Sequence, residues 1–188
     1  MPTSDYTRGI VTEADGVATK LGVVSDTHIP GRARQLPPDL LLGLEGVERI
    51  LHAGDLVDLE VIETLAKIAP VTAVRGNADY PEVRVTLRAH EIVELDGVLI
   101  GMVHGDGETR TTLWRAQHAF GEKPSDSSAR PLAAVVFGHS HQPYCARHDG
   151  VLYLNPGSPT DHRRAERPSF AFLHVRDDGT VDAEHVWL

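Results

Sequence analysis

The sequence predicts an α/β protein in which two mixed sheets pack face to face, with helices on their outer faces. Two observations lead to this fold class. In the first half of the chain, apolar runs alternate with amphipathic stretches, which is the order of parallel strands and crossover helices. In the second half, apolar runs come in pairs joined at Asp-Gly turns, which is the pattern of antiparallel hairpins.

The composition fits one globular domain. A chain of 188 residues with 41% hydrophobic and 24% charged residues is long enough to bury a core without disulfides. The formal net charge of -9 argues against nucleic acid as a partner, because a basic face is needed to displace counterions from phosphates. Cys145 is the single cysteine, so neither a disulfide framework nor a thiolate zinc site is expected. The sequence shows no signal pattern and no apolar run of membrane length, so the chain is expected to be cytoplasmic, without membrane contact. Assembly into a homo-oligomer is possible.

The first half of the chain supplies the parallel elements. We expect residues 1–19 to form an N-terminal extension, frayed at its start, with an edge strand at Gly9–Glu13 that meets the next strand at an Asp-Gly turn. Residues 20–188 are expected to form the single domain. Strands are predicted at Val17–Val24, Val47–His52 and Val71–Val74, and helices from about Pro38 to Leu44 and from about Leu59 to Ile68.

The second half supplies the hairpins. A hairpin of His90–Leu95 and Val98–Val103 is followed by a predicted helix, Glu108–Phe120, and by a surface loop at 121–130. A strand is predicted at Ala133–Phe137, and two further Asp-Gly turns make hairpins of the remainder.

Polar side chains follow the ends of the predicted strands. They are Asp26, His28, Asp55, Asn77, His104, His139 and His141. They recur at about the length of a strand-helix-strand unit, roughly 30 residues, so each is expected at the carboxyl edge, where open α/β sheets bind ligands. Carboxylate, imidazole and amide groups suit Mn²⁺, Fe²⁺, Ni²⁺ or Zn²⁺. Seven ligands exceed the need of one ion but suit two ions about 3.5–4 Å apart that share a carboxylate.

Each of these residues also has a plainer interpretation. Asp26 and His28 could cap a loop, and Asp55 could be a helix N-cap. Asn77 could be a left-handed turn residue, and His104 a buried, hydrogen-bonded histidine. The plain alternative for His139 and His141 is a pair of surface histidines. These alternatives explain single residues, but they do not explain why all seven follow strand ends.

Taken in order, five short motifs resemble those of the calcineurin-like metallophosphoesterases. The motifs are Asp26-Thr27-His28, Gly54-Asp55, Gly76-Asn77, His104 and Gly138-His139-Ser140-His141. The short chain, Gly76-Asn77-Ala78-Asp79 and Asn155-Pro156-Gly157-Ser158 are similar to the small YfcE-type phosphodiesterases. The resemblance covers about Lys20 to Leu188 and implies the metallo-dependent phosphatase-like fold, a four-layer α-β-β-α sandwich.

The resemblance also implies a ligand set. It places Asp26, His28 and His141 on one divalent ion, and Asn77, His104 and His139 on the other. Asp55 would bridge the two ions. Mn²⁺ is the expected metal, with Ni²⁺, Fe²⁺ or Zn²⁺ as alternatives.

The implied activity is that of a dinuclear metal-dependent phosphodiesterase. A metal-bridging hydroxide would attack a small phosphodiester, with Asp55, Asn77 and His104 as the catalytic residues. Larger family members carry a histidine directly after the asparagine; here Ala78 stands there, so the acid that protonates the leaving group is unassigned. The alternatives are a phosphomonoesterase or nucleotide phosphatase, and a non-catalytic protein-interaction scaffold on the same fold, for which eroded ligands are expected.

Other residues near these motifs have open roles. Asp79 could orient a ligand or be a turn carboxylate, and His52 could orient a ligand or pack in the core. The polar loop with His162, Arg163 and Arg164 could reach a phosphate or be a solvated loop.

Overall fold

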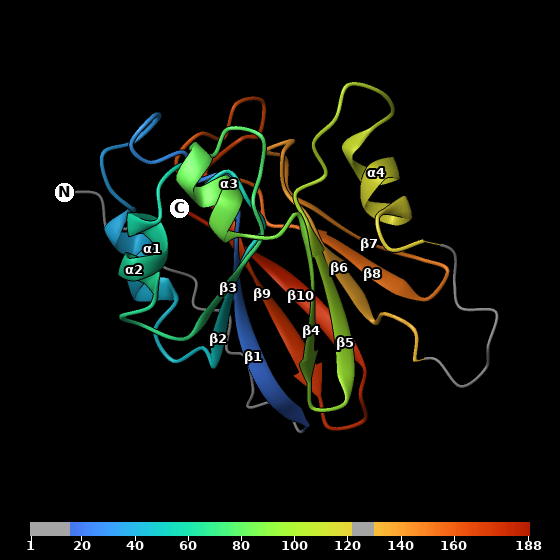
Figure 1. The fold of residues 1–188 in the computed structure, drawn as a ribbon. Helices are drawn as coiled ribbons and strands as arrows, with labels where there is room; N and C mark the ends of the chain where they lie inside the picture. The colour runs from blue at the N-terminus through green and yellow to red at the C-terminus, as the bar shows by residue number, and fades with distance from the viewer. Residues whose placement is uncertain (1–15, 122–129) are drawn as a thin grey trace.

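The computed structural model describes residues 16–121 and 130–188. In these ranges the chain forms two five-stranded sheets, with strand orders β10-β9-β1-β2-β3 and β4-β5-β6-β8-β7, called here the first and the second sheet. The sheets lie face to face with helices outside them (Figure 1), so the predicted four-layer sandwich is confirmed. No helix in the described part of the chain is long and apolar enough to cross a membrane.

The first sheet is built around three parallel strands. They are β1 (Val17–Val24), β2 (Arg49–His52) and β3 (Val71–Ala73). Beyond β1, strand β9 (Ser169–Arg176) pairs antiparallel with β1, and β10 (Val181–Trp187) pairs antiparallel with β9. Val24 pairs with His52, and His52 with Ala73. The three parallel strands therefore end level, and the loops that follow them leave from one edge.

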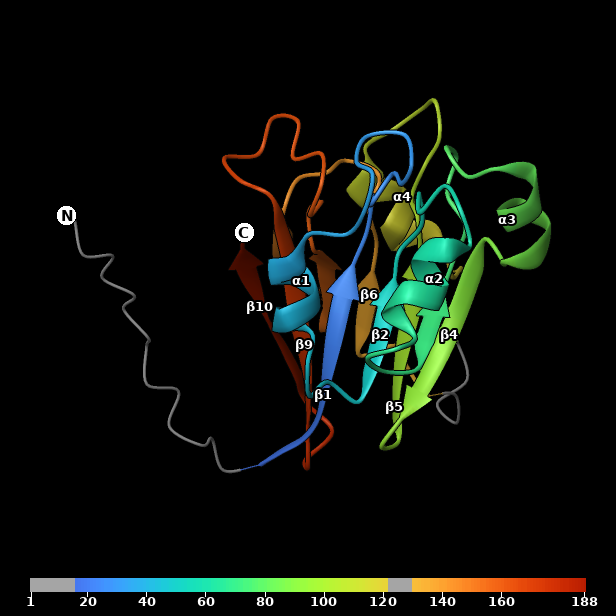
Figure 2. The ribbon, with the colours of Figure 1, turned by 90° about the vertical axis from the view of Figure 1, so that its left-hand side faces the viewer.

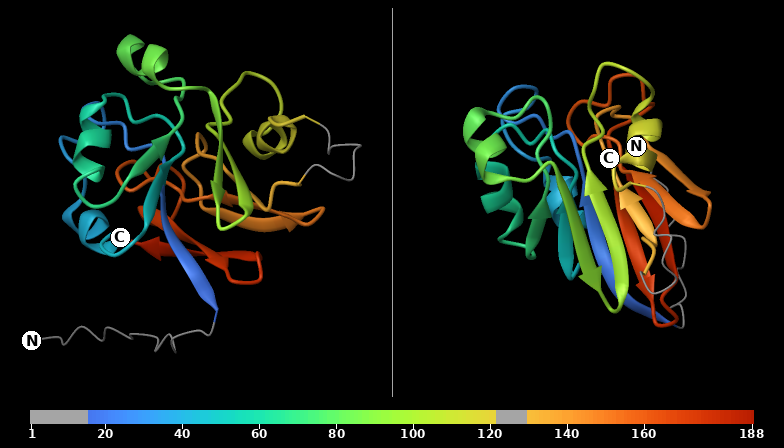
Figure 3. Two further views of the ribbon diagram at one scale, coloured as in Figure 1. Left: turned by 60° about the horizontal axis from the view of Figure 1, so that its bottom comes forward. Right: turned by 45° about the vertical axis from the view of Figure 1, so that its right-hand side comes forward.

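The second sheet has the same arrangement at its centre. Its strands are β4 (His90–Leu95), β5 (Val98–Val103), β6 (Ala134–Val136), β7 (Tyr144–His148) and β8 (Val151–Asn155). Met102, Val136 and Leu154 stand level on β5, β6 and β8, which run parallel. Their following loops leave from one edge as well, and the loops of both sheets gather at one end of the sandwich (Figures 2 and 3).

Three apolar cores hold the layers together. The first lies between the sheets and includes Leu51, Ile100 and Met102, all fully buried. A second core packs α1 (Pro38–Gly43) and α2 (Glu60–Leu65) against the outer face of the first sheet, and a third packs α4 (Thr112–His118) against the second sheet (Figures 1 and 2). Burial of each large apolar side chain contributes about 1.5–3 kcal/mol.

The helices differ from expectation in extent. Helix α4 begins at Thr112 instead of Glu108, because Thr111 caps it and accepts a hydrogen bond from the Trp114 amide at 3.1 Å. Helix α2 ends at Leu65, three residues before the predicted end at Ile68. Helix α3 (Pro81–Thr86) was not predicted; Pro81 at its start is a helix-opening signal, and it buries Val83 in the outer core of the first sheet.

Some predictions concern residues that the structure leaves out. The edge strand Gly9–Glu13 with its turn, and the interior of the 121–130 loop, lie outside the described residues. Strand β1 begins at Val17, within the predicted N-terminal extension.

Candidate metal centre

The loops at the shared edge bring six of the seven predicted ligands into two clusters. One cluster consists of Asp26, His28 and His141, and the other of Asp55, His104 and His139. In each cluster the ligand atoms lie within 4.8 Å of one another. Each cluster combines residues from loops of both sheets.

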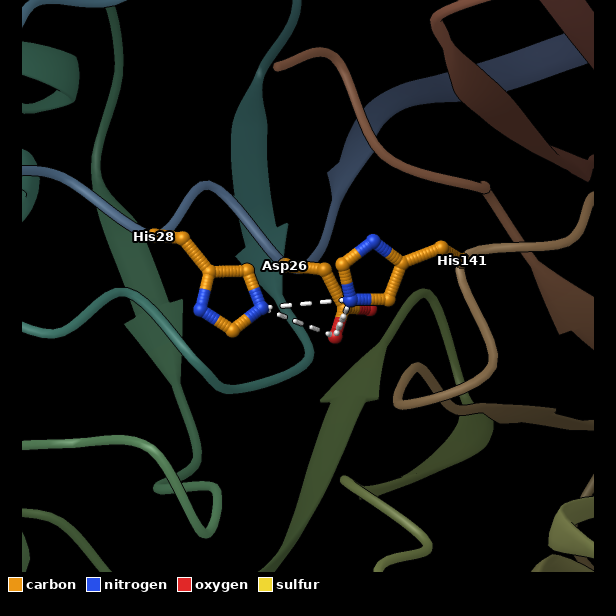
Figure 4. A group of neighbouring side chains, drawn as sticks. All are labelled: Asp26, His28 and His141. Atoms are coloured by element: carbon orange, nitrogen blue, oxygen red, sulfur yellow. Dashed lines mark hydrogen bonds and ion pairs between the residues drawn. The ribbon is translucent and has the colours of Figure 1, made fainter. Parts of the chain in front are cut away.

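The first cluster converges on the Oδ1 atom of Asp26 (Figure 4). This oxygen lies 3.2 Å from Nε2 of His141 and 3.8 Å from Nε2 of His28. The two Nε2 atoms are 3.2 Å apart. Three potential ligand atoms therefore point at one small volume.

The second cluster is linked to the first through Asp55. Its Oδ2 atom lies 3.2 Å from Nε2 of His104 and 3.6 Å from Nε2 of His28, which belongs to the first cluster. The His139 ring stands edge-on to His104, with ring centroids 5.3 Å apart. Asp55 thus lies between the two clusters and contacts a histidine of each.

Asn77, the seventh predicted ligand, lies in the loop after β3, where its side chain is exposed. Its backbone is outside the left-handed region, so the alternative of a left-handed turn residue is wrong. The next residue, Ala78, donates its amide N–H to Oδ1 of Asp55 at 2.7 Å.

Hydrogen bonds set the orientation of two ligand imidazoles. Nδ1 of His104 donates to the carbonyl of Ala53 at 2.7 Å, and Nδ1 of His141 donates to the carbonyl of Asp161. In a neutral imidazole this places the lone pair on Nε2, the atom that faces the cluster. On Asp26, Oδ2 accepts from the Ser25 hydroxyl and the His139 amide, which leaves Oδ1 for a ligand.

Two buried ligand atoms lack any hydrogen-bond partner in the described part of the chain. They are Oδ1 of Asp26 and Nε2 of His104. A buried polar atom without a partner costs about 1–3 kcal/mol, so native proteins rarely keep one. Divalent ions would satisfy both atoms, and a set of oxygen and nitrogen donors without sulfur suits Mn²⁺, Fe²⁺, Ni²⁺ or Zn²⁺. The residues present therefore fit two ions.

The charges in the centre are strongly coupled. Burial alone would raise the pKa of Asp26, but its contacts with His141 and His28 and the charge of His104 hold that pKa far below its usual range. Burial opposes protonation of His104, yet the Asp55 carboxylate, 3.2 Å from its Nε2 atom, and the charge of Asp26 raise its pKa to about 9. The two carboxylates thus favour a positive charge at this position.

Five of the seven predicted ligands have a left-handed backbone. Their φ angles are 56° at Asp26, 46° at His28, 55° at Asp55, 66° at His139 and 58° at His141. This conformation costs a residue with a side chain roughly 1–2 kcal/mol and persists where surrounding contacts fix it, often at functional sites. It turns consecutive side chains away from the usual alternation, so that residues two apart in sequence can face one cluster.

Three glycines leave the space that the ligands occupy. A Cβ atom on Gly138 would lie 1.9 Å from Oγ of Ser25 and 2.8 Å from Oδ2 of Asp26, and one on Gly76 would lie 2.2 Å from Oδ1 of Asp55. A Cβ on Gly54 would lie 2.7 Å from Nδ1 of His104. The glycine in each motif is therefore required by close approach of the neighbouring ligand.

Two buried polar residues brace the ligand loops. His52 donates from Nε2 to the Thr27 hydroxyl at 3.1 Å, and its Nδ1 accepts from the Gly54 amide at 3.3 Å. Burial lowers the pKa of His52 to about 4, so the ring is neutral. Asp79 accepts from the amides of Val57 and Gly76 at 2.7 and 2.6 Å, and so ties together the loops after β2 and β3.

The end of β8 and the segment after it add supports that sequence reasoning did not assign. Nδ2 of Asn155 donates to the Gly138 carbonyl at 2.7 Å, and the Ser158 hydroxyl donates to the Asp26 carbonyl at 2.8 Å. The Thr160 hydroxyl donates to the Thr27 carbonyl at 2.7 Å. The motif at 155–158 was a signal for Asn155 and Ser158, whereas nothing in the sequence marked Thr160 or Asp161.

Comparisons with known proteins agree with this geometry. The family model described as a calcineurin-like phosphoesterase superfamily domain matches residues 19–178. A probable metallophosphoesterase of Methanothermobacter thermautotrophicus is 35% identical over 164 residues, which covers 87% of this chain and 90% of the relative. A phosphodiesterase of Methanocaldococcus jannaschii is 25% identical over 152 residues, with 73% and 82% covered. The solved structure of vacuolar protein sorting 29 from Cryptosporidium parvum has a TM-score of 0.69 at 21% identity, over 92% of this chain and 98% of that chain, and so shares the fold.

Proposed function

The chain belongs to the calcineurin-like phosphoesterase superfamily, and from that premise we propose that it is a dinuclear metal-dependent phosphodiesterase acting on a small phosphodiester. The observation that carries the proposal is the pair of ligand clusters linked through Asp55, each with a buried ligand atom that has no hydrogen-bond partner among the described residues. A relative 25% identical to this chain is named a phosphodiesterase, which supports the reaction type.

The proposed ligands divide between two ions. Asp26, His28 and His141 would hold one, Asn77, His104 and His139 would hold the other, and Asp55 would contribute to both. Mn²⁺ is the first expectation for the metal. When bound, such ions lower the pKa of a water molecule so that hydroxide is available near neutral pH, and they neutralise charge on the phosphoryl oxygens.

The residues of the chain supply the orientation and the charge. Asp55 is held by the Ala78 amide through Oδ1, which leaves Oδ2 directed between the clusters. Burial opposes ionisation of Asp55, but the close contact of its carboxylate with the His104 ring and the charge of that ring lower the pKa of Asp55, so the carboxylate stays ionised. Ala78 has no side chain that can donate a proton to the leaving oxygen, which favours diesters whose leaving groups need none.

Two alternatives remain distinct from this proposal. A phosphomonoesterase or nucleotide phosphatase would use the same centre on a dianionic substrate. A protein-interaction scaffold would use the fold without the reaction. The full set of seven ligand residue types in this chain favours an enzyme over a scaffold, because a scaffold does not need them.

The test is metal reconstitution of chelator-treated protein. We expect Mn²⁺ or Ni²⁺ to restore hydrolysis of bis(p-nitrophenyl) phosphate, and we expect Asp55→Ala to abolish it while Glu45→Ala, an exposed carboxylate in the turn after α1, does not. A preference for p-nitrophenyl phosphate would indicate the monoesterase. Protein that binds two metals and hydrolyses neither ester would leave the scaffold as the function.

A further inference from the structure

We propose that Arg32 and Arg163 form a subsite for a second phosphate group of the substrate, beside the first metal cluster. The inference rests on the proposed function, since it concerns a part of the diester that is not cleaved. It is carried by the position of both arginines around Asp161, a residue whose main chain also holds the ligand His141.

The two arginine segments are fixed to the ligand loops by hydrogen bonds. The Arg32 amide donates to the His28 carbonyl at 2.6 Å. On the other side, the Asp161 amide donates to the Ser158 hydroxyl at 2.9 Å, and Ser158 in turn binds the Asp26 carbonyl. The segments that carry the arginines are therefore built onto the metal cluster.

Both guanidinium groups approach a single carboxylate oxygen. Nε of Arg32 lies 3.4 Å and Nε of Arg163 lies 3.7 Å from Oδ2 of Asp161. The same oxygen is 3.8 Å from Nδ1 of His141. The arginine side chains are 65% and 45% exposed, against 22% for Asp161, so the charges face solvent at the rim of the centre.

The charges at this rim do not balance. Two cations share one anion, which leaves one positive charge in a protein whose formal net charge is -9. The contacts to Asp161 are longer than the usual 2.7–3.2 Å of an N–H···O hydrogen bond. Within the described part of the chain neither guanidinium has another partner, so their terminal nitrogens are available. Paired N–H donors of a guanidinium match the oxygens of a phosphate.

The side of His141 on which the arginines lie identifies the group that they would bind. Nε2 of His141 faces Asp26 and His28, while Nδ1 faces away from them (Figure 4). Because Asp161 and its arginines lie on the Nδ1 side, the imidazole ring separates them from the ligand atoms. A phosphate at the metal cluster is therefore a different group from a phosphate at the arginines.

Arg115, near the second cluster, has a different role. It donates from Nε to the Gly105 carbonyl, from Nη1 to the carbonyls of Thr109 and Arg110, and from Nη2 to the Thr112 hydroxyl. These four hydrogen bonds brace one loop. The arginines at Asp161 are free for a ligand in a way that Arg115 is not.

Two chromogenic diesters that differ by one phosphate test the subsite. Thymidine 5′-(p-nitrophenyl phosphate) lacks a second phosphate, and its 3′-phosphorylated form carries one. We expect kcat/KM of the Mn²⁺-loaded protein to be about tenfold higher for the 3′-phosphorylated form, as two exposed ion pairs would give. The preference should shrink at high salt, because exposed charges are screened.

Variants assign the preference to the named residues. Arg32→Gln combined with Arg163→Gln should bring the ratio of the two kcat/KM values close to one, whereas Arg34→Gln, an exposed arginine of the same loop, should keep it. Asp161→Asn should raise the ratio, because it removes the competing carboxylate and keeps the main-chain carbonyl that holds His141. This opposite direction of change does not depend on whether the double variant folds.

Direct binding separates failure of the subsite from failure of the proposed reaction. Calorimetry with thymidine 3′,5′-bisphosphate and thymidine 5′-phosphate should show about tenfold tighter binding of the bisphosphate to the loaded wild-type protein. If neither chromogenic diester is cleaved but the bisphosphate binds tighter, the proposed reaction fails and the subsite stands. Equal binding of both nucleotides and equal cleavage of both diesters would overturn the subsite and leave the phosphodiesterase.

Discussion

Replacement of Gly76 by alanine tests the close packing around the shared carboxylate. Gly76 does not have a left-handed backbone, so alanine is compatible with its conformation. The added Cβ would nevertheless lie 2.2 Å from Oδ1 of Asp55, 2.6 Å from the Asp55 amide nitrogen and 2.8 Å from Cδ2 of His104. Since real Cβ atoms essentially never come closer than 3.0 Å to such atoms, Asp55 has to move.

The size of the effect follows from this displacement. To restore 3.0 Å or more, the Asp55 carboxylate must shift by roughly 1 Å, and a misplacement of that size costs on the order of a hundredfold in rate. A hundredfold corresponds to about 2.7 kcal/mol in the activation free energy. The overpacked loop should also lose about 1–3 kcal/mol of folding stability.

The assay compares Gly76→Ala with Gly31→Ala. Gly31 also lacks a left-handed backbone, and its added Cβ would have its nearest contact, the His28 carbonyl oxygen, at 3.4 Å. Metal content, kcat/KM for bis(p-nitrophenyl) phosphate and urea unfolding are measured for both variants. Wild-type metal content and activity in Gly76→Ala would refute the argument that this glycine makes room for Asp55.

Acidifying the metal-free protein should reduce the free energy of unfolding through His52, whose pKa falls from 6.5 to about 4 on burial. The contribution of His52 to the free energy of unfolding is present above pH 6.5 and falls by about 3 kcal/mol as the pH falls towards 4, because the unfolded chain takes up the proton first. Equal pH dependence of urea unfolding in wild type and His52→Gln would contradict this. Mn²⁺ should bind the folded protein, where Asp26 Oδ1 and His104 Nε2 would gain partners, and at a hundredfold its Kd it should raise the free energy of unfolding by about 2.7 kcal/mol. A melting temperature that does not change on adding chelator would argue against this. Leu51→Ala, in the core between the sheets, should cost about 2–5 kcal/mol in urea unfolding, whereas Leu42→Ala, 66% exposed, should change stability by less than about 0.5 kcal/mol; similar losses in both would contradict the assigned core.

Features with a local cause were predictable from the sequence. The turn Asp96-Gly97 joins β4 and β5, and the turn Asp149-Gly150 joins β7 and β8, as predicted. All four residues have positive φ angles, between 50° and 86°, which is the conformation that two-residue hairpin turns require and that Asp-Gly favours. The apolar runs likewise predicted which strands carry the polar residues at their ends.

Features that depend on distant contacts were not predictable. Asp26 is held by the Gly54 carbonyl and by the hydroxyl of Ser158, which is 132 positions further along the chain, and no local pattern predicts its left-handed backbone. Helix α3 is only six residues long, and buries Val83 against an outer core formed by other segments. The sequence was sufficient to predict that the seven ligands follow strand ends. The orientation of each side chain depends on tertiary contacts such as these, which the sequence does not display.

The origin of each cluster in both sheets has a consequence for the order of folding. Asp26 and His28 follow β1 of the first sheet, whereas His141 follows β6 of the second, more than 110 positions later. Neither sheet on its own presents a complete set of ligands. If ions bind as proposed, their uptake by a refolding chain would require that the two sheets have already docked, so uptake would report the docked sandwich and not either sheet alone.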